Sequence, residues 1–243
     1  MFQRSSGFLS NIPPVTLNLI IINFLCFAAS FVFSRSGVNL NYILGLHYFG
    51  ANAFNPVQLI TYMFMHANIS HIFFNMFSLF MFGKTLEYTW GGKRFLIYYM
   101  VTGIGAALVQ QGVWWIQVRE LLSQDSFRLG QYVIDRADFL INYLPDYLNN
   151  AFLTIGASGA VFGILLAFGM LFPNAQLYMM FIPFPIRAKY FVIGYGILEL
   201  FLGVASFNGD NIAHFAHLGG MIFGYILIKI WKKQDFNNGK YFY

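Results

Sequence analysis

The sequence predicts an all-α membrane protein with six transmembrane helices, and two observations carry this prediction. Hydrophobic residues make up 58% of the 243 residues and charged residues only 9%, whereas ordinary globular chains carry about 25% charge. The charged residues also separate long uncharged stretches, most of which exceed the roughly 18 residues needed to span hydrocarbon. A segment inside a bilayer satisfies its own backbone hydrogen bonds only as a helix. A soluble globular protein is therefore excluded.

Six hydrophobic stretches define the predicted spans. We expect helices near residues 14–34, 66–83, 94–115, 156–173, 189–207 and 212–231. They form a single membrane domain over residues 1–243, with a core at about 13–232, an outer loop at 116–155 and a cytoplasmic tail at 233–243. Residues 1–13 lack the charged start and apolar centre of a cleaved signal peptide, so we expect the first span to be retained.

The basic residues indicate the orientation of the chain. Only Arg35, Arg119, Arg128 and Arg136 fall in the connections on one side of the predicted membrane, and the other ten fall on the opposite side: Arg4, Lys84, Lys93, Arg94, Arg187, Lys189, Lys229, Lys232, Lys233 and Lys240. Short cytoplasmic connections carry an excess of Lys and Arg. We therefore expect both termini in the cytoplasm. The membrane that we expect the protein to span is a bacterial inner (plasma) membrane. The net charge of +5 then points to the lipid bilayer as partner and not to nucleic acid.

The two outer connections differ in character. Residues 34–64 are rich in Tyr and Phe but are interrupted by Gly, Asn and Pro, which predicts a segment lying at the membrane interface. Residues 116–155 have enough helical pattern for a short surface helix that docks a partner. The single cysteine, Cys26, lies in the first span and offers neither a disulfide nor a cysteine metal cluster.

Four polar residues stand near the outer ends of three predicted helices. His71 and Asn75 share one face of the second helix, Ser158 opens the fourth, and His217 lies about one turn inside the sixth. With both termini inside, these three helices all begin at the outer face, so the four side chains lie at similar depth. Polar groups at membrane depth are costly unless they meet partners or water, which makes each a candidate functional residue.

Each of these motifs alone has a simpler structural explanation. The small residues around Ser158, and Gly220 with Gly224, are typical of closely packed membrane helices, and His71 with Asn75 fits an interhelical hydrogen bond. Together they suggest chemistry, because a nucleophilic serine needs a base within reach and donors for the developing oxyanion. On that reading Gly159, Gly163, Gly220 and Gly224 bring helices four and six close enough for Ser158 to reach His217.

The sequence resembles the rhomboid intramembrane serine proteases. The resemblance rests on the runs HANISHIFFNMF, GKTLEYTWGGKRFLIYY, IGASGAVFG and AHFAHLGGMIFG in this order, within residues of about 13–232. It implies a six-transmembrane-helix rhomboid-like bundle with an interfacial first outer loop and no cofactor or metal. It also implies cleavage of single-pass membrane proteins near the outer membrane boundary, with substrates entering beside the fifth helix.

The resemblance also implies a role for each site residue. Ser158 matches the nucleophile and His217 the general base, while His71 and Asn75 match the side chains that stabilise the oxyanion together with the backbone N–H of Ser158. Phe162 matches an aromatic residue beneath the catalytic imidazole.

Three further positions complete the comparison. Gly156 matches the small residue before the nucleophile, and Glu87 matches a structural carboxylate near the inner end of helix two. Where some relatives carry Trp-Arg in the first outer loop, this chain has Val57-Gln58.

The sequence favours a Ser-His dyad over a triad. No carboxylate lies beside His217 in its own helix, and Asp210 stands seven residues earlier, in the predicted outer loop. Glu199 in the fifth span is an anomaly, because carboxylates in membrane helices face protein or water. The sequence assigns it no catalytic role.

Three rival functions remain open at the sequence level. A metal enzyme could gather His66, His71, His214 and His217, although the H-E-x-x-H signature is absent and no acidic partner completes a ligand set at helical spacing. A non-catalytic rhomboid-like protein would bind membrane clients without cutting them. A carrier would use Glu199 and the histidines for proton coupling. The sequence leaves the substrate and the oligomeric state open.

Overall fold

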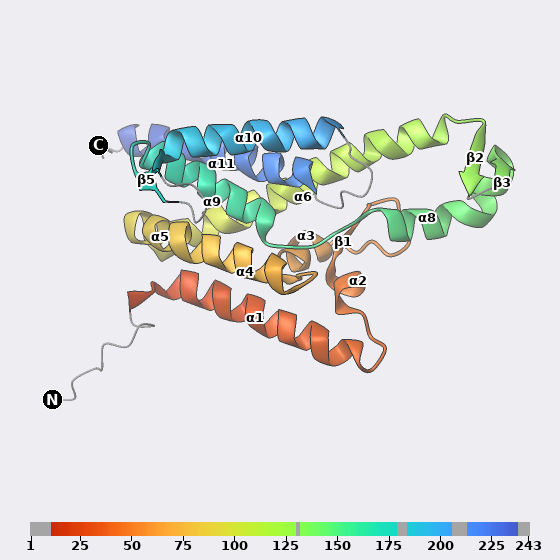
Figure 1. Cartoon of the computed structure of the whole chain (residues 1–243), viewed down its shortest axis with the longest axis horizontal. Helices are drawn as coiled ribbons and strands as arrows, with labels where there is room; N and C mark the ends of the chain where they lie inside the picture. The colour runs from red at the N-terminus through yellow and green to blue at the C-terminus, as the bar shows by residue number, and fades with distance from the viewer. Residues whose placement is uncertain (1–10, 130–131, 179–183, 206–212, 238–243) are drawn as a thin grey trace.

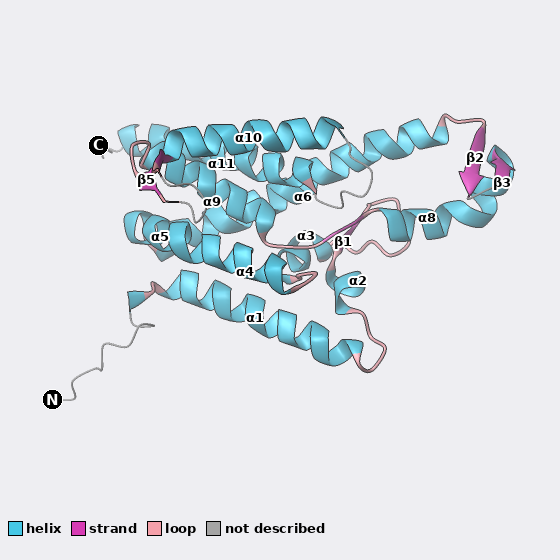
Figure 2. Ribbon diagram, viewed as in Figure 1, coloured by secondary structure: helices cyan, strands magenta, loops and turns pink. Residues whose placement is uncertain are grey.

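The structure is a computed structural model that describes residues 11–129, 132–178, 184–205 and 213–237 (Figure 1). Most of these residues are helical (Figure 2). The predictions that concern Arg4, Asp210 and Lys240 lie outside the described residues.

The long helices overlap the predicted spans, although several of them run further. They are α1 (Pro14–Ser34), α4 (Ile69–Ser78), α6 (Gly92–Leu122), α9 (Ser158–Leu171), α10 (Ala188–Ala205) and α11 (His214–Asn237). Helix α4 continues through the π-helical turn η3 (Leu79–Gly83) into α5 (Lys84–Trp90). Three of them, α1, α6 and α10, are long and apolar enough to cross a membrane, and α9 is a shorter apolar helix. The predicted cytoplasmic tail is helical as far as Asn237.

Short elements fill the connections. The helical ones are α2 (Leu40–Leu44), α3 (Gln58–Thr61), η2 (Tyr62–Phe64), α7 (Arg136–Asp138), η4 (Phe139–Tyr143) and α8 (Leu144–Ala151). Three antiparallel strand pairs join β1 (Leu46–His47) to β4 (Leu153–Thr154), β2 (Ser126–Leu129) to β3 (Tyr132–Asp135), and β5 (Gln176–Leu177) to β6 (Ile186–Arg187). The fold is thus mainly helical, as predicted. The short strand pairs lie in the connections, where segments between helices satisfy their backbone groups by pairing with each other.

Polar contacts at one end of the bundle hold helix starts against helix ends. Arg94, in the first turn of α6, makes a bidentate ion pair with Asp235 near the end of α11, at 2.9 and 2.6 Å. Glu87 in α5 accepts hydrogen bonds from the backbone N–H groups of Val15 and Thr16 at the start of α1. The start of α1 and the end of α11 therefore lie at the same end, and α4, α9 and α11 begin at the opposite end (Figure 1).

The centre of the bundle is built from α6, α9 and α11, and glycines set their spacing. A Cβ at Gly220 of α11 would overlap the backbone of Gly159 in α9, so these two helices touch directly. Gly163 and Gly224 instead face α6, where they meet Thr102 and the Tyr98 side chain. The prediction that all four glycines join helices four and six is thus correct for one pair only. The other pair lets α6 pack against both helices.

The first outer segment is organised around Gln58. This side chain is 3% exposed; its oxygen accepts from the backbone N–H groups of His47 and Asn55, and its amide donates to two backbone carbonyls. His47 is fully buried and its ring bonds two further backbone carbonyls. Neighbouring Val57 is 60% exposed and apolar. Gln58 therefore holds the segment from inside while Val57 offers an apolar surface.

The second outer segment is more ordered than predicted. Helix α6 runs to Leu122, beyond the expected end at residue 115, and the β2–β3 hairpin and α8 follow it. These elements extend past the ends of the other helices (Figure 1). Phe127 of the hairpin stacks on Phe139 with ring centroids 3.8 Å apart, so the segment has a small aromatic core. The expected surface helix is present, but the hairpin was not predicted.

Candidate active site

A distorted turn delivers Ser158 to the start of α9. Gly156 has φ of 128°, a backbone conformation that residues with a side chain rarely adopt. Its N–H donates to the Tyr62 carbonyl at 2.9 Å, and a Cβ at this position would lie 2.7 Å from Nε2 of His71. Glycine is thus required both for the turn and for the approach of the His71 imidazole. Ser158 is the first residue of α9, so its N–H has no partner within the helix.

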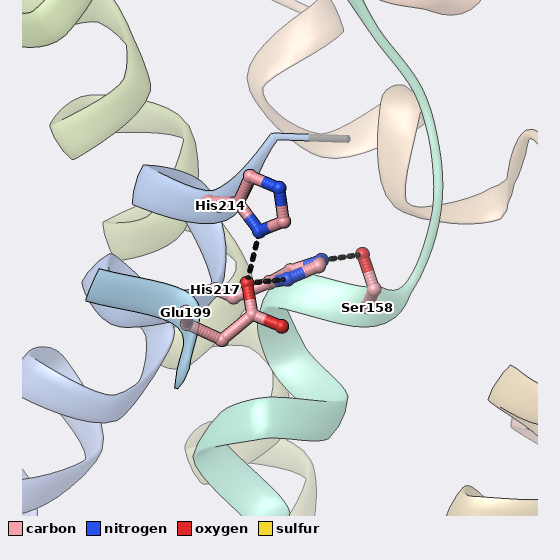
Figure 3. Close-up of polar contacts among 4 residues, drawn as sticks. All are labelled: Ser158, Glu199, His214 and His217. Carbon is pink, nitrogen blue, oxygen red and sulfur yellow. Dashed lines mark hydrogen bonds and ion pairs between the residues drawn. The ribbon is translucent and has the colours of Figure 1, made fainter. Parts of the chain in front are cut away.

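Ser158 and His217 lie within hydrogen-bond distance of each other. Oγ of Ser158 is 2.8 Å from Nε2 of His217, which comes from the first turn of α11 (Figure 3). Phe162, one turn after the serine, stacks on the imidazole with centroids 4.2 Å apart and planes 6° apart. The contact between Gly159 and Gly220 brings the two helices this close. The structure therefore joins the serine and histidine that the sequence places 59 residues apart.

His71 and Asn75 line the same cavity as Ser158 and His217, which has a volume of about 660 Å³. The N–H of Ala67 donates to Nδ1 of His71 at 3.4 Å, so a neutral His71 carries its proton on Nε2, the nitrogen nearest Gly156. Asn75 donates one amide hydrogen to the carbonyl of His71 at 2.9 Å and keeps a second. Both side chains are therefore positioned as donors beside the serine.

The structure adds a carboxylate that the sequence analysis left without a role. Oε2 of Glu199 in α10 lies 2.9 Å from Nδ1 of His217 and 2.6 Å from Nδ1 of His214 (Figure 3). The predicted dyad was based on the absence of a carboxylate beside His217 in its own helix, α11. Glu199 approaches His217 from a different helix, α10. The sequence did contain an indication that Glu199 is functional, because a carboxylate inside a membrane span needs polar partners.

The same three residues are the described side chains best placed to hold a metal ion. Ligand atoms of Glu199, His214 and His217 all lie within 4.8 Å of one another. However, neighbouring ligands of a tetrahedral zinc site with bonds of about 2.0 Å stand about 3.3 Å apart, whereas the two N···O distances here are 2.6 and 2.9 Å. Those distances match hydrogen bonds from imidazole N–H groups to a carboxylate. His66 packs against His71 with ring centroids 5.0 Å apart and is not part of this cluster.

A helical membrane protein with a serine, a hydrogen-bonded imidazole and nearby donors has the parts of a membrane-embedded serine hydrolase. Comparison with known proteins identifies the family to which the protein belongs. The rhomboid domain model matches residues 53–234, and the chain therefore belongs to the rhomboid family, a family of intramembrane serine proteases. It is an integral membrane protein.

Individual relatives agree with this assignment. The chain is 30% identical to RHOMBOID-like protein 12, mitochondrial, of Arabidopsis thaliana, over 90% of this chain and 62% of that protein. It is 26% identical to Rhomboid-like protein 11, chloroplastic, of the same plant (88% and 64%), and 26% identical to Rhomboid protease AarA of Providencia stuartii (88% and 70%). The chain thus spans less than two thirds of the two plant proteins. Relatives named mitochondrial and chloroplastic do not support the expected bacterial inner membrane.

Proposed function

We propose that this protein is a rhomboid-type serine endopeptidase that cleaves transmembrane segments of single-pass membrane proteins near the outer membrane boundary. The observation that carries the proposal is the 2.8 Å contact between Ser158 Oγ and His217 Nε2 at the edge of an open cavity. Oγ attacks the peptide carbonyl while Nε2 takes its proton. The imidazolium then protonates the leaving amine, and water hydrolyses the acyl-enzyme with His217 acting as base and acid in turn.

The oxyanion is stabilised by donors from two helices. His71 Nε2–H and the second amide hydrogen of Asn75 come from α4, and the N–H of Ser158 comes from the first residue of α9. The N-terminus of α9 adds a partial positive charge at the same place. Donors fixed before the reaction stabilise the tetrahedral intermediate without reorganising.

The cavity also supports entry of a substrate from the side. Its polar groups include His71, Ser158 and His217 in the first turns of α4, α9 and α11. An aromatic wall continues between α4 and α10 through Phe74, Phe191 and Tyr195. An apolar segment reaches the serine along this wall, while water enters from the outer end. Residues that destabilise a membrane helix, such as Gly and Pro, expose a substrate backbone at that depth.

The proposed topology has six spans, with α4 to α5 and α11 joining the four apolar helices named above. Basic residues gather at the end where α1 begins, which includes Lys93, Arg94 and Lys232. By the positive-inside rule we place both termini on the cytoplasmic side, or on its equivalent in an organelle. Exposed Val57 and Phe49 then lie at the outer interface.

The proposal is tested by reconstituting the protein in liposomes with a panel of single-pass substrates. We expect cleavage at mapped sites near the outer boundary, labelling of Ser158 by a fluorophosphonate, and loss of both in Ser158→Ala and His217→Ala. Client binding without cleavage by the wild type would support the non-catalytic alternative. Cleavage that survives Ser158→Ala would rule out the proposed nucleophile.

A further inference from the structure

We propose that Glu199 is a positioning residue that converts the Ser158–His217 pair into a triad, with His214 holding the carboxylate in place. This inference rests on the proposed function. It adds α10 to the machinery that α4, α9 and α11 contribute (Figure 3).

Glu199 faces the protein interior, unlike its neighbours in α10. Its neighbours Leu198 and Leu200 are 46% and 51% exposed, whereas Glu199 is 5% exposed. Most of α10 faces away from the protein, since only 17% of its residues are buried. A carboxylate inside an apolar helix requires partners, and the partners of Glu199 are two imidazoles of the proposed site.

Glu199 determines the tautomer of His217. A carboxylate only accepts hydrogen bonds, so an Oε2 atom 2.9 Å from Nδ1 places a proton on Nδ1. A neutral imidazole then has its free lone pair on Nε2, which lies 2.8 Å from Ser158 Oγ. This is the form that accepts the serine proton. The carboxylate selects the base and also orients its ring.

His214 contacts the same carboxylate as His217. Its Nδ1 lies 2.6 Å from the same oxygen, Oε2, so the carboxylate accepts two N–H groups from one helix, α11. His214 and His217 are three residues apart and share a face of that helix. Two donors on one oxygen favour the ionised carboxylate and restrict its rotation. His214 therefore fixes Glu199, and Glu199 fixes His217.

Protons balance throughout this mechanism. The Ser158 proton moves to Nε2 of His217 as the C–O bond forms, and then to the nitrogen of the leaving amine as the C–N bond breaks. Glu199 stays ionised and keeps accepting from both Nδ1–H groups. Its negative charge stabilises the imidazolium that exists between these two transfers.

The effect of removing the charge follows from the surroundings of the imidazole. Among the residues that the structure describes, the titratable groups around it are Glu199 and Tyr195 of α10, His214 of α11 and His71 of α4. Of these only Glu199 supplies a negative charge at neutral pH. Without it the imidazolium is less stable, so the acid limb of the pH–rate profile moves to lower pH. The amide of Glu199→Gln can also donate to Nδ1, which would force the proton onto Nε2 and block the base.

The experiment compares Glu199→Gln and Glu199→Asp with the wild type in liposomes, measuring kcat, KM and the pH dependence of fluorophosphonate labelling. We expect kcat of Glu199→Gln to fall at least about tenfold, with KM within about twofold because the carboxylate lies on the edge of the imidazole away from Ser158. The acid limb should move to lower pH, because the imidazolium loses a neighbouring negative charge. Glu199→Asp keeps the anion, so it should retain more activity than Glu199→Gln and a wild-type acid limb.

The matched control is Glu87→Gln, which changes another buried carboxylate of a membrane helix, at the opposite end of the bundle. It should lower thermal stability while leaving kcat and the pH profile unchanged. If Glu199→Gln does not fold, 15N NMR of the wild type decides, with the His217 signal assigned by its loss in His217→Ala. We expect the proton of neutral His217 on Nδ1.

Any of three results would overturn the inference. The first is a Glu199→Gln enzyme whose kcat is within twofold of the wild type and whose acid limb is unmoved. The second is a Glu199→Asp enzyme no more active than Glu199→Gln, and the third is a proton on Nε2 of neutral His217. Each of these leaves the proposed function intact as long as Ser158→Ala remains inactive. Activity in Ser158→Ala would instead remove the proposed function itself.

Discussion

Replacing Gly220 by alanine tests whether helix spacing controls the site. A Cβ at this position would overlap the carbonyl oxygen of Gly159 and lie 2.8 Å from its carbonyl carbon. Carbon atoms in contact prefer separations of about 3.5–4.0 Å, so α11 must move away from α9 by about 1 Å. Backbone atoms of a helix cannot rotate aside as a side chain does, so the displacement reaches the residues on either side.

The expected consequence is a broken contact between Ser158 and His217. Adding about 1 Å to their 2.8 Å separation exceeds the range of a hydrogen bond. A misplacement of this size costs about 100-fold in rate, or about 2.7 kcal/mol of transition-state stabilisation. The assay is fluorophosphonate labelling and substrate cleavage in liposomes, with thermal stability measured in parallel. We expect a folded protein with about 1% of wild-type activity.

Gly194→Ala is the control for this prediction. Gly194 lies in α10, and a Cβ there meets no heavy atom within 4 Å among the described residues, so activity should stay within twofold. A folded Gly220→Ala protein with at least half the wild-type labelling rate would refute the argument that the glycine contact sets the geometry of the site.

Three further outcomes are expected. Asn75→Ala should lose about 3 kcal/mol of transition-state stabilisation yet remain measurably active, unlike Ser158→Ala; equal inactivity of the two would mean that Asn75 does more than donate. Glu87→Ala should lower the free energy of unfolding by about 1–3 kcal/mol, read from a thermal or denaturant curve, because the start of α1 loses the acceptor of Thr16; an unchanged curve would show that this cap is not needed. Chelators should leave the cleavage rate within twofold, and their inhibition would point to a metal at the Glu199 cluster.

Much of the fold could be predicted because membrane helices obey a local rule. An apolar stretch of sufficient length satisfies its backbone only as a helix, so the predicted first span, residues 14–34, coincides with α1. Segments outside that constraint were predicted less well. The β2–β3 hairpin and the extra length of α6 depend on contacts such as Phe127 with Phe139, which no periodicity reveals.

The glycines show the same division between local and tertiary information. The pattern around Gly220 and Gly224 indicated close packing but not which helix each residue meets. The structure places Gly220 against Gly159 and Gly224 against Tyr98. A small residue permits approach from any neighbour, and only the crossing geometry of three helices selects the neighbour.

The sequence by itself determined that the chain crosses a membrane. It predicted that the helices α4, α9 and α11 begin at one end and that Ser158, His217, His71 and Asn75 form one candidate site. Those conclusions follow from hydropathy, charge and motifs along the chain. Only the tertiary structure decided that Glu199 joins them, because its contact with His217 links two different helices. Sequence spacing shows which residues share a helix face, whereas the rotation of one helix against another decides which faces meet.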